Sequence, residues 1–564
     1  MFPARRAKGP PERYAPMHLL LSSVFGPFGV DDPFGSRYNK MELFHNQVTR
    51  EQGLFSFRFN HPTFGLHFLA ENVQVPTTVL DFPTWERFDA ELRSGRYTHV
   101  GISFIVPNFE KAKVMAELVR QIDPDIRIIL GGHGTSVPEA RTQIPHDHLC
   151  VGEGVRFLRR IFGENEERAI VHPLVHSSFN KNVMGVKLPD ESGVLVPGVG
   201  CANRCKFCAT SHFFGQYTPY LATGKEVFDV CCRYEDELGI TDFGVLDENF
   251  LKVPERALEL VALMERHQRF FNFAIFSSAE TLRSLPGLDF LVRMGVTFIW
   301  MGVESKKACY EKNAGVDFHD LVAQLRGRGI SVMTSVILFE EHHDHETIFE
   351  DIDFGVGLKS DYVQFMQLGP MNGTALFEDY AHRGKLLPEI PYRERHGQEK
   401  IWFTHPSFTR EESFTFLKAA FAKDYRENGP SFLRLMDTAL RGLVYTRGHA
   451  DPFVRRRAAD HKKQAGLMRH FLAAARGASE NEATSRLVDD LRTRFELLLG
   501  PPSLKERMIN GAVAALAHSR GLRNALLSDV RQPPIRVHRY RVAPAISSVL
   551  RPLPRPRVPA LDAT

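Results

Sequence analysis

The sequence of 564 residues has no run of consecutive apolar residues as long as a membrane-spanning helix requires, which is about 20 residues. Its first 16 residues are basic and rich in proline, and the apolar stretch after them, residues 17–24, is short. No cleavage site of small residues follows this stretch cleanly, so the pattern does not favour a secretory signal peptide. We therefore expect a cytoplasmic protein.

Charge of one sign is not in excess either. Lys and Arg number 71 against 67 Asp and Glu, and the net charge of +4 is small for this length. This balance does not indicate nucleic acid as the main partner. Cysteine is scarce: there are seven, an odd number, and three of them are clustered. Such usage fits a reducing compartment better than a disulfide framework.

The clustered cysteines, Cys201, Cys205 and Cys208, have the spacing C-x3-C-x2-C. Thiolates bind iron–sulfur clusters, and a [4Fe–4S] cluster normally takes four of them. No fourth cysteine is close in sequence, so one iron of such a cluster would stay open to a small molecule. The alternatives are three buried thiols, or a zinc site with His212 as the fourth ligand. No second Cys/His pair follows at the distance typical of zinc sites.

This spacing, with the aromatic Phe207 directly before the last cysteine, resembles the radical S-adenosylmethionine (SAM) superfamily. The resemblance implies that the open iron binds the amino and carboxylate groups of SAM. An electron from the cluster would then cleave SAM into methionine and a 5′-deoxyadenosyl radical. The three cysteines would be both the metal ligands and the catalytic centre, Phe207 would lie against the adenine, and flavodoxin or ferredoxin would donate the electron.

An apolar pattern upstream predicts a parallel βαβ unit, with a strand at 99–106, a helix at 109–121 and a strand at 125–130. Ligands of such sheets lie outside the carboxyl ends of the strands, where glycine lets the backbone come close. The sequence predicts further strands at 18–24 and 77–81 and helices at 64–72 and 84–94.

This segment resembles the cobalamin-binding domain that precedes many radical SAM domains. The matching residues are Gly101, Ile102 and Ser103 on one strand, Gly131 and Gly132 after the next, and Gly152, Glu153 and Gly154 further on. The resemblance implies that the corrin lies over these strand ends, with the nucleotide tail in the sheet. The pattern D-x-H-x-x-G, whose histidine replaces the lower cobalt ligand, is absent. We expect this position to be open or water-filled, with His133 as a candidate near the corrin; a Rossmann-like domain that binds nothing is the alternative.

Six strands alternate with helices in the middle of the chain and predict a parallel, barrel-like sheet. They are expected at 194–199, 241–246, 271–276, 297–301, 330–338 and 362–367. The resemblance implies a partial (β/α)6 barrel with the cluster at its open top.

Polar residues follow several of these strands, where chemistry collects in barrels. The run Asp247–Glu248–Asn249 resembles the position that binds the SAM amino group, and an ammonium needs such acceptors. Glu304 resembles the acidic residue that family members use on SAM, on the ribose hydroxyls, and Ser277 is a further candidate. Capping of a nearby helix is the alternative for Asn249.

The last third of the sequence is helical in pattern, with helices at 411–428, 431–445, 452–476 and 480–499 that are expected to close over the barrel mouth. An amphipathic helix is predicted at 505–528. Residues 531–557 are rich in Arg and Pro and are expected to be extended or disordered, as a solvated tail or in contact with anionic lipid. His342, His343 and His345 resemble a metal tract, but a solvated loop is favoured.

The sequence thus predicts an α/β protein with a Rossmann-like cobalamin-binding domain at 1–165, a radical SAM partial barrel at 190–375, a helical domain at 376–500 and a basic tail at 501–564. We expect a cobalamin-dependent radical SAM methyltransferase that acts on an unactivated carbon. Aromatic residues that favour a lipid or natural-product substrate are Phe213, Phe214, Tyr217, Trp402 and Phe403. The alternatives are radical cyclisation, rearrangement or carbon–carbon bond formation without methyl transfer, and a non-catalytic iron–sulfur or corrinoid-binding partner.

Overall fold

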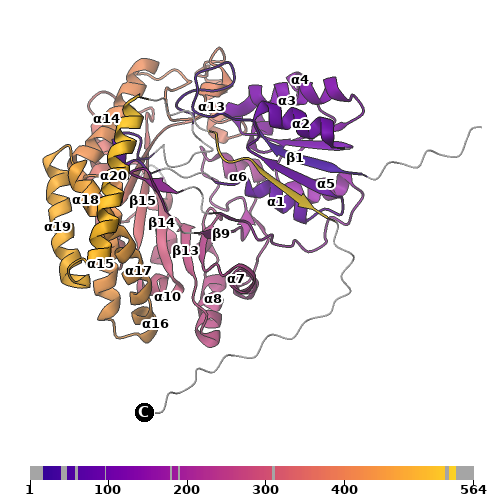
Figure 1. Cartoon of the computed structure of the whole chain (residues 1–564). Coiled ribbons are helices and arrows are strands. Elements are labelled where there is room, and N and C mark those ends of the chain that lie inside the picture. Colours follow the sequence, from indigo (N-terminus) through magenta and orange to yellow (C-terminus); the bar gives the residue numbers. More distant parts are fainter. Residues whose placement is uncertain are drawn as a thin grey trace, which may run out of the picture.

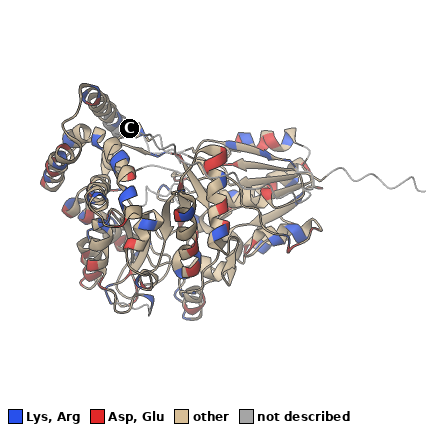
Figure 2. Cartoon of the chain, turned by 90° about the horizontal axis from the view of Figure 1, so that it is seen from below, with Lys and Arg blue, Asp and Glu red and all other residues tan. Residues whose placement is uncertain are grey.

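Two α/β units and a group of helices lie side by side in the computed structural model of the protein (Figure 1). No helix in the described part of the chain has the length and apolar character needed to cross a membrane. Basic and acidic residues are interspersed along the helices (Figure 2). The structure describes residues 17–39, 48–57, 61–95, 97–177, 181–188, 191–307, 311–526 and 532–541.

The N-terminal unit is a six-stranded sheet in the order β17-β2-β1-β3-β4-β5. Strands β1 to β5 are parallel, and helices cover both faces, with α1 and α5 on one and α2 and α3 on the other. The sheet strands are β1 (Leu19–Ser23), β2 (Thr77–Asp81), β3 (His99–Ser103), β4 (Arg127–Gly131) and β5 (His148–Leu149). The helices are α1 (Phe64–Glu71), α2 (Trp85–Ser94), α3 (Phe109–Ile122), α4 (Ala140–Gln143) and α5 (Gly154–Ile161). The strands and helices predicted here are confirmed, and the layering is Rossmann-like.

The second unit is a seven-stranded sheet in the order β16-β15-β14-β13-β12-β9-β6. Its first six strands are parallel and follow the chain order, and the edge strand β6 is antiparallel. The strands are β6 (His176–Ser177), β9 (Ser192–Leu195), β12 (Asp242–Val245), β13 (Asn272–Phe276), β14 (Val296–Glu304), β15 (Ser331–Leu338) and β16 (Tyr362–Gln367). The predicted parallel sheet is therefore present. Two short hairpins join it, β7 (Asn182–Val183) with β8 (Val186–Lys187), and β10 (Gly198–Val199) with β11 (Thr218–Pro219).

Helices connect these strands, and local sequence sets their limits. Thr223 and Glu226 form a capping box at the start of α7, and Gly239 ends it in the left-handed conformation. Pro254 opens α8, where a missing backbone N–H has no cost. The helices are α6 (Ala209–Phe214), α7 (Gly224–Leu238), α8 (Pro254–His267), α9 (Ala279–Arg283), α10 (Asp289–Met294), α11 (Phe318–Gly327) and α12 (Ile348–Gly357).

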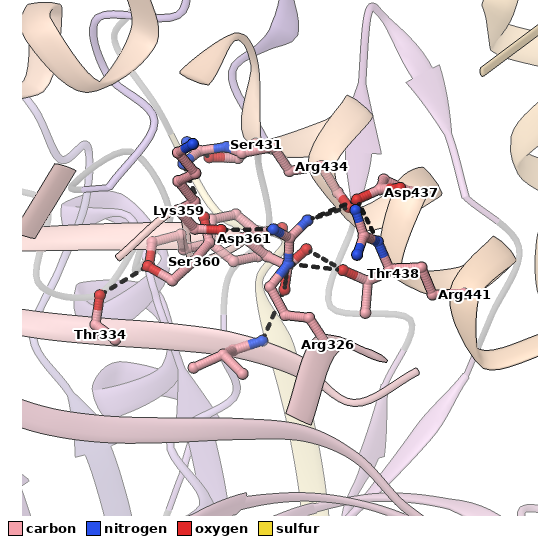
Figure 3. Close-up of polar contacts among 12 residues, drawn as sticks. Arg326, Thr334, Lys359, Ser360, Asp361, Ser431, Arg434, Asp437, Thr438 and Arg441 are labelled. Atoms are coloured by element: carbon pink, nitrogen blue, oxygen red, sulfur yellow. Dashed lines mark hydrogen bonds and ion pairs between the residues drawn. The ribbon is translucent and has the colours of Figure 1, made fainter. Parts of the chain in front are cut away.

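Helix α15 and the turn at Arg457 lie at the amino ends of the strands, which corrects the prediction that these helices close over the carboxyl ends. Arg434 on α15 donates to Ser360 O at 2.8 Å (Figure 3), and Arg457 donates to Asn272 Oδ1 at 3.1 Å. These arginines reach polar groups at the start of the strands. Helices α13 and α14 instead begin near the carboxyl ends, where Leu376 N donates to Lys206 O at 3.0 Å and Gln367 Nε2 to Ser413 Oγ at 3.4 Å. The helices are α13 (Ala375–His382), α14 (Arg410–Asn428), α15 (Ser431–Arg447), α16 (Pro452–Arg456), α17 (Ala458–Met468), α18 (Leu472–Gly477), α19 (Glu482–Leu499) and α20 (Leu504–Leu526).

Two corrections concern the segment that was predicted to be a tail. Helix α20 belongs to the helical core, because Val513 and Ala517 are buried in it. Residues Arg536–Tyr540 form β17, an antiparallel edge strand on β2 (Figure 1). An edge strand offers unpaired backbone groups, and β17 pairs with those of β2. The basic, proline-rich first 16 residues and the last part of the predicted tail, residues 542–564, lie outside the described residues.

Candidate functional site

A cavity of about 510 Å³ lies between the carboxyl ends of the N-terminal strands and the loop that carries the three cysteines. One wall comes from the N-terminal unit, with Ser103, Gly131, Gly132, His133, Gly152 and Glu153. The other wall comes from the second unit, with Val199, Gly200, Thr210, Phe213, Phe214, Asp247 and Glu248. The structure therefore brings residues from both resemblances to one space.

Glycines give this cavity its floor. Gly132 has φ +85°, and a Cβ there would lie 2.5 Å from the carbonyl oxygen of Phe104. A Cβ on Gly101 would lie 2.6 Å from the side chain of Leu21, whereas one on Gly131 would meet nothing within 4 Å. The chain is thus close-packed beneath the floor and open above Gly131, so a flat ligand can approach the backbone.

His133 joins the two units at the cavity. Its ring stacks on Phe213 of α6, with centroids 4.5 Å apart, and meets Phe214 edge-on. Burial lowers the pKa of His133 to about 4, so the ring is neutral at physiological pH. Its Nε2 is buried and has no hydrogen-bond partner among the described residues. Such an atom is rare in native proteins and indicates a missing ligand or water.

Glu153 has a structural role here, although it lines the cavity. Its carboxylate caps α5 by accepting from Val155 N at 2.8 Å and from Arg156 N at 2.9 Å. The same group accepts from the hydroxyl of Tyr220 at 2.7 Å. Burial, and next to it the charge of Glu153, raises the pKa of Tyr220 well above its usual value. Glu153 therefore ties the N-terminal unit to the second unit.

The three cysteines lie between β10 and α6 and are half-buried. Burial raises the pKa of Cys201 to about 11 and also raises that of Cys205. A backbone N–H of Asn203 donates to the Cys201 sulfur at 3.5 Å. Burial thus disfavours the thiolates of Cys201 and Cys205 in the metal-free protein, and a bound metal would offset this, because metal ligands must be deprotonated.

The three cysteine sulfurs are not a compact set of ligand atoms: among the described residues, they are not all within 4.8 Å of one another. Sulfurs that share one tetrahedral zinc lie about 3.8 Å apart, since each Zn–S bond is about 2.3 Å, so a zinc site would require the side chains to move. Nε2 of His212 is buried and has no hydrogen-bond partner in the described part of the chain.

The three residues Asp247, Glu248 and Asn249, which follow β12, have different roles. Asp247 is buried and accepts from Arg256 at 2.8 Å and from the hydroxyl of Tyr217 at 2.7 Å. Asn249 faces away from the cavity, where its amide bonds Ser278 at 2.9 Å. Glu248 lines the cavity; burial raises the pKa of its carboxyl group, and a hydrogen bond with Thr210 acts in the opposite sense. Asp247 and Glu248 both line the cavity, but the oxygens of Asp247 already accept from protein groups, which leaves Glu248 as the acceptor better placed for a ligand.

The other predicted SAM residues do not line the cavity. Glu304, with φ +60°, pairs with Lys312 at 2.5 Å, and the charges of both act on Cys205. Ser277 is buried and donates to the carbonyl of Ser278 at 3.3 Å. Phe207 packs against the core of the second sheet.

The histidine tract lies in a loop, as favoured, with His342 and His345 exposed, but His343 is an exception. His343 is buried; its Nδ1 accepts from Glu340 N at 3.1 Å, so its Nε2 donates to Asp351 at 2.8 Å. His342 lies within 4.8 Å of this pair, and this compact group could hold an ion. His345 is exposed and pairs with Glu412. Both nitrogens of His343 are satisfied by protein, which indicates a structural role.

Sequence reasoning missed Arg256, Thr210 and Lys312. Arg256 lies on α8 and its side chain is only 1% exposed. A buried arginine in an otherwise amphipathic helix is a signal that could have been noticed. Of the aromatic candidates, Phe213 and Phe214 line the cavity, whereas Trp402 and Phe403 are buried in the core.

Comparisons with known proteins support the resemblance on which the first wall of the cavity was predicted, that to a cobalamin-binding domain. The family model of the B12 binding domain matches residues 55–161. The chain is 22% identical over 362 residues, 58% of its length, to 78% of an uncharacterized methyltransferase of Pyrococcus horikoshii. It is 37% identical over 68 residues to cytidylyl-2-hydroxyethylphosphonate methyltransferase of Streptomyces wedmorensis, 12% of each chain. The chain thus carries a B12-binding domain and is weakly similar to methyltransferases.

The residues of the first wall fit a corrinoid. The glycine floor leaves room above Gly131, and the unpaired Nε2 of His133 lies at the same strand ends. The cavity continues between the N-terminal sheet and helices α1 and α5, past Leu21, Leu66, Leu69, Ile129 and Leu158. An apolar extension of this kind suits the flat base of a nucleotide tail.

Proposed function

We propose that this protein is a cobalamin-dependent radical SAM methyltransferase. One observation carries the proposal: a single cavity has the B12-binding strand ends on one side, and on the other Glu248 together with Gly200 and Thr210, which flank the three-cysteine segment. A methyl donor and an activated substrate must meet within bond-forming distance, and a shared cavity meets this need. The names of the two relatives as methyltransferases support the same reaction.

The cysteine loop would hold a [4Fe–4S] cluster through Cys201, Cys205 and Cys208. The wide spread of the three sulfurs agrees with thiolates on different irons. Glu248 would accept hydrogen bonds from the SAM ammonium, because its carboxylate faces the cavity. Asp247, held by Arg256 and Tyr217, would fix the backbone that presents Glu248.

When bound, the cluster and SAM would supply the chemistry that activates an unreactive carbon, and cobalamin would supply the methyl group. The chain itself orients these groups and keeps water out. Apolar side chains form most of the cavity wall, among them Phe64, Phe68, Phe213, Phe214 and Phe276. We propose a lipid or natural product as substrate, a flavodoxin or ferredoxin as electron donor, and the cytoplasm as the compartment.

The test is a spectroscopic and chemical assay of anaerobically purified, reconstituted full-length protein. We expect iron and acid-labile sulfide near four of each per chain, since a cubane cluster holds about four. With dithionite and SAM, 5′-deoxyadenosine should form, and added hydroxocobalamin should remain bound after gel filtration with its visible spectrum.

Each other outcome has a meaning. SAM cleavage without corrinoid binding would remove methyl transfer and favour radical cyclisation, rearrangement or carbon–carbon bond formation. Corrinoid or iron binding without SAM cleavage would favour a non-catalytic partner protein. Absence of iron and sulfide would contradict the proposal as a whole.

A further inference from the structure

Three segments that are far apart in sequence meet where the last strand of the second sheet ends. Gln367, the final residue of β16, donates its backbone N–H to Gly397 O at 3.1 Å and its side-chain amide to Glu399 O at 2.8 Å. Arg50 donates from Nη1 to Gln398 O at 2.7 Å. These contacts place residues 396–399 between the strand end and Arg50.

Buried polar atoms without partners gather in this group. Among the described residues, Nε and Nη2 of Arg50 and both ring nitrogens of His396 have no hydrogen-bond partner, although Nε2 of His396 lies 3.7 Å from Glu399. Gln367 and Gln398 each leave the side-chain oxygen unpaired. Native structures pair nearly all buried polar atoms, and an unpaired atom calls for a water, an ion or a ligand. Six such atoms on four neighbouring residues point to one bound group that carries both acceptors and donors.

Arg50 is the cation of the group. Arg50 lies over the ring of Phe421 at 4.4 Å, and burial lowers its pKa to about 10, so it stays protonated at neutral pH. Glu399 is the carboxylate of the group, but it accepts from Ser36 at 2.7 Å and lies 3.7 Å from Nε2 of His396. Two N–H groups of the buried Arg50 guanidinium therefore lack an acceptor. A planar guanidinium can bind an oxyanion through two N–H groups at once.

The position suits a substrate. Gln367 ends β16 at the carboxyl end of the second sheet, the end that also carries Glu248 and the cysteine loop. Polar side chains continue from there along the sheet: Ser335 donates to Gln364 at 2.7 Å and accepts from Trp300 at 2.6 Å. Ligands of parallel α/β sheets bind at this end.

We infer that Arg50 and His396 form a binding site for an oxyanion of the substrate, a carboxylate or a phosphoryl group. The oxygens of Gln367 and Gln398 then accept hydrogen bonds from a hydroxyl or amine beside that anion. The inference rests on the proposed function only in assigning the anion to the substrate, because anion binding itself needs neither cluster nor corrinoid.

The experiment uses the full-length chain without cofactors. Thermal unfolding is followed while sodium phosphate, and separately sodium acetate, replaces sodium chloride at constant ionic strength. We expect at least one of these anions to raise the unfolding temperature with a saturable, millimolar dependence. Arg50→Met, which keeps an apolar contact with Phe421, and His396→Asn should each weaken the apparent affinity tenfold or more.

The matched control is Arg395→Met. Arg395 is next in sequence and also stacks on an aromatic ring, Tyr392, but it donates to the carbonyls of Pro388 and Ile390. It should keep the anion response. No response of the wild type to either anion, or an unchanged response in both Arg50→Met and His396→Asn, would overturn the inference. Neither result would affect SAM cleavage or corrinoid binding, so the two proposals fail separately.

Discussion

The two ends of the seven-stranded sheet are built differently. At the amino end, arginines meet carboxylates: Arg434 pairs with Asp424 at 2.6 Å. Arg326 lies 3.4 Å from Asp361, and Figure 3 shows these two residues. At the carboxyl end, Arg50 is stacked on a ring with two N–H groups unpaired.

The difference separates stability from function. Charges that are paired inside a protein hold elements together, whereas unpaired polar atoms cost free energy unless a ligand satisfies them. Positive φ at non-glycine residues occurs at both ends: Glu304 and Phe339 at the carboxyl end have φ +60° and +67°, and Gln268 and Lys359 at the amino end have φ +54° and +51°. Such backbone conformations persist where the surrounding fold holds them in place, so they do not distinguish the two ends.

The largest expected effect is at the carboxyl end. Replacing Cys201, Cys205 or Cys208 by Ala should abolish iron retention after reconstitution, since each thiolate is one of three protein ligands. The free energy of unfolding of the cofactor-free protein should change by only about 1 kcal/mol or less, as for substitutions outside the packed core. Iron analysis and urea unfolding measure the two quantities. Cys232→Ala, half-buried in α7, is the control that should retain iron.

At the amino end of the sheet, a substitution should lower the free energy of unfolding rather than affect cofactor binding. Arg434→Met leaves the buried Asp424 carboxylate without its partner, which should lower the free energy of unfolding by about 3–5 kcal/mol. The double variant with Asp424→Leu should recover most of this loss, because no charge then remains buried. Urea unfolding followed by circular dichroism gives both values. A double variant as unstable as the single one would show that the ion pair is not the cause.

Protonation of His461 at acidic pH should destabilise the packing of the helices at the amino end of the second sheet. Burial, and then the charge of Arg457, lowers the pKa of His461 to about 4 from 6.5. The unfolded chain therefore binds a proton between pH 6.5 and 4 that the folded protein does not. The free energy of unfolding should fall in that window, by at most about 1.4 kcal/mol per pH unit for this group. His461→Gln should flatten the slope of unfolding free energy against pH, and an unchanged slope would count against this assignment.

The smallest effect should distinguish two neighbours in the run after β12. Glu248→Gln should weaken SAM binding to the reconstituted protein by about 10- to 100-fold, the value of a hydrogen bond to a charged group. Its fold should be unaffected, because burial already disfavours the charged form. Asp247→Asn should instead destabilise the fold, since it weakens a buried ion pair with Arg256. Equilibrium dialysis with SAM and thermal unfolding separate the two effects.

The strands were predictable because each is a short apolar run closed by glycine or a polar residue. The limits of β2 and β16 agree with the prediction residue for residue. Local patterns could not tell which member of the run Asp247–Glu248–Asn249 faces the cavity. That choice depends on Arg256 and Tyr217, which approach from elsewhere in the chain.

Docking of the last helices and of β17 was not predictable for a related reason. An amphipathic helix shows that it has a partner but not which one. Strand β17 pairs with residues more than 450 positions earlier; for example, Arg536 pairs with Asp81. The sequence of these five residues, which are of mixed polarity, does not indicate which strand they pair with. Tyr540 of β17 also bonds His67 of α1 at 2.7 Å, a contact between side chains that are distant in sequence.

By itself, the sequence determined the order of strands and helices and the three-cysteine spacing, because these depend on residues a few positions apart. Only the tertiary structure decided that the B12-binding strand ends face the flanks of the cysteine segment across one cavity, that Asp247 and Glu248 but not Asn249 line it, and that Arg50 reaches the carbonyl of Gln398. These are long-range contacts, and they are selected by the packing of whole units against one another.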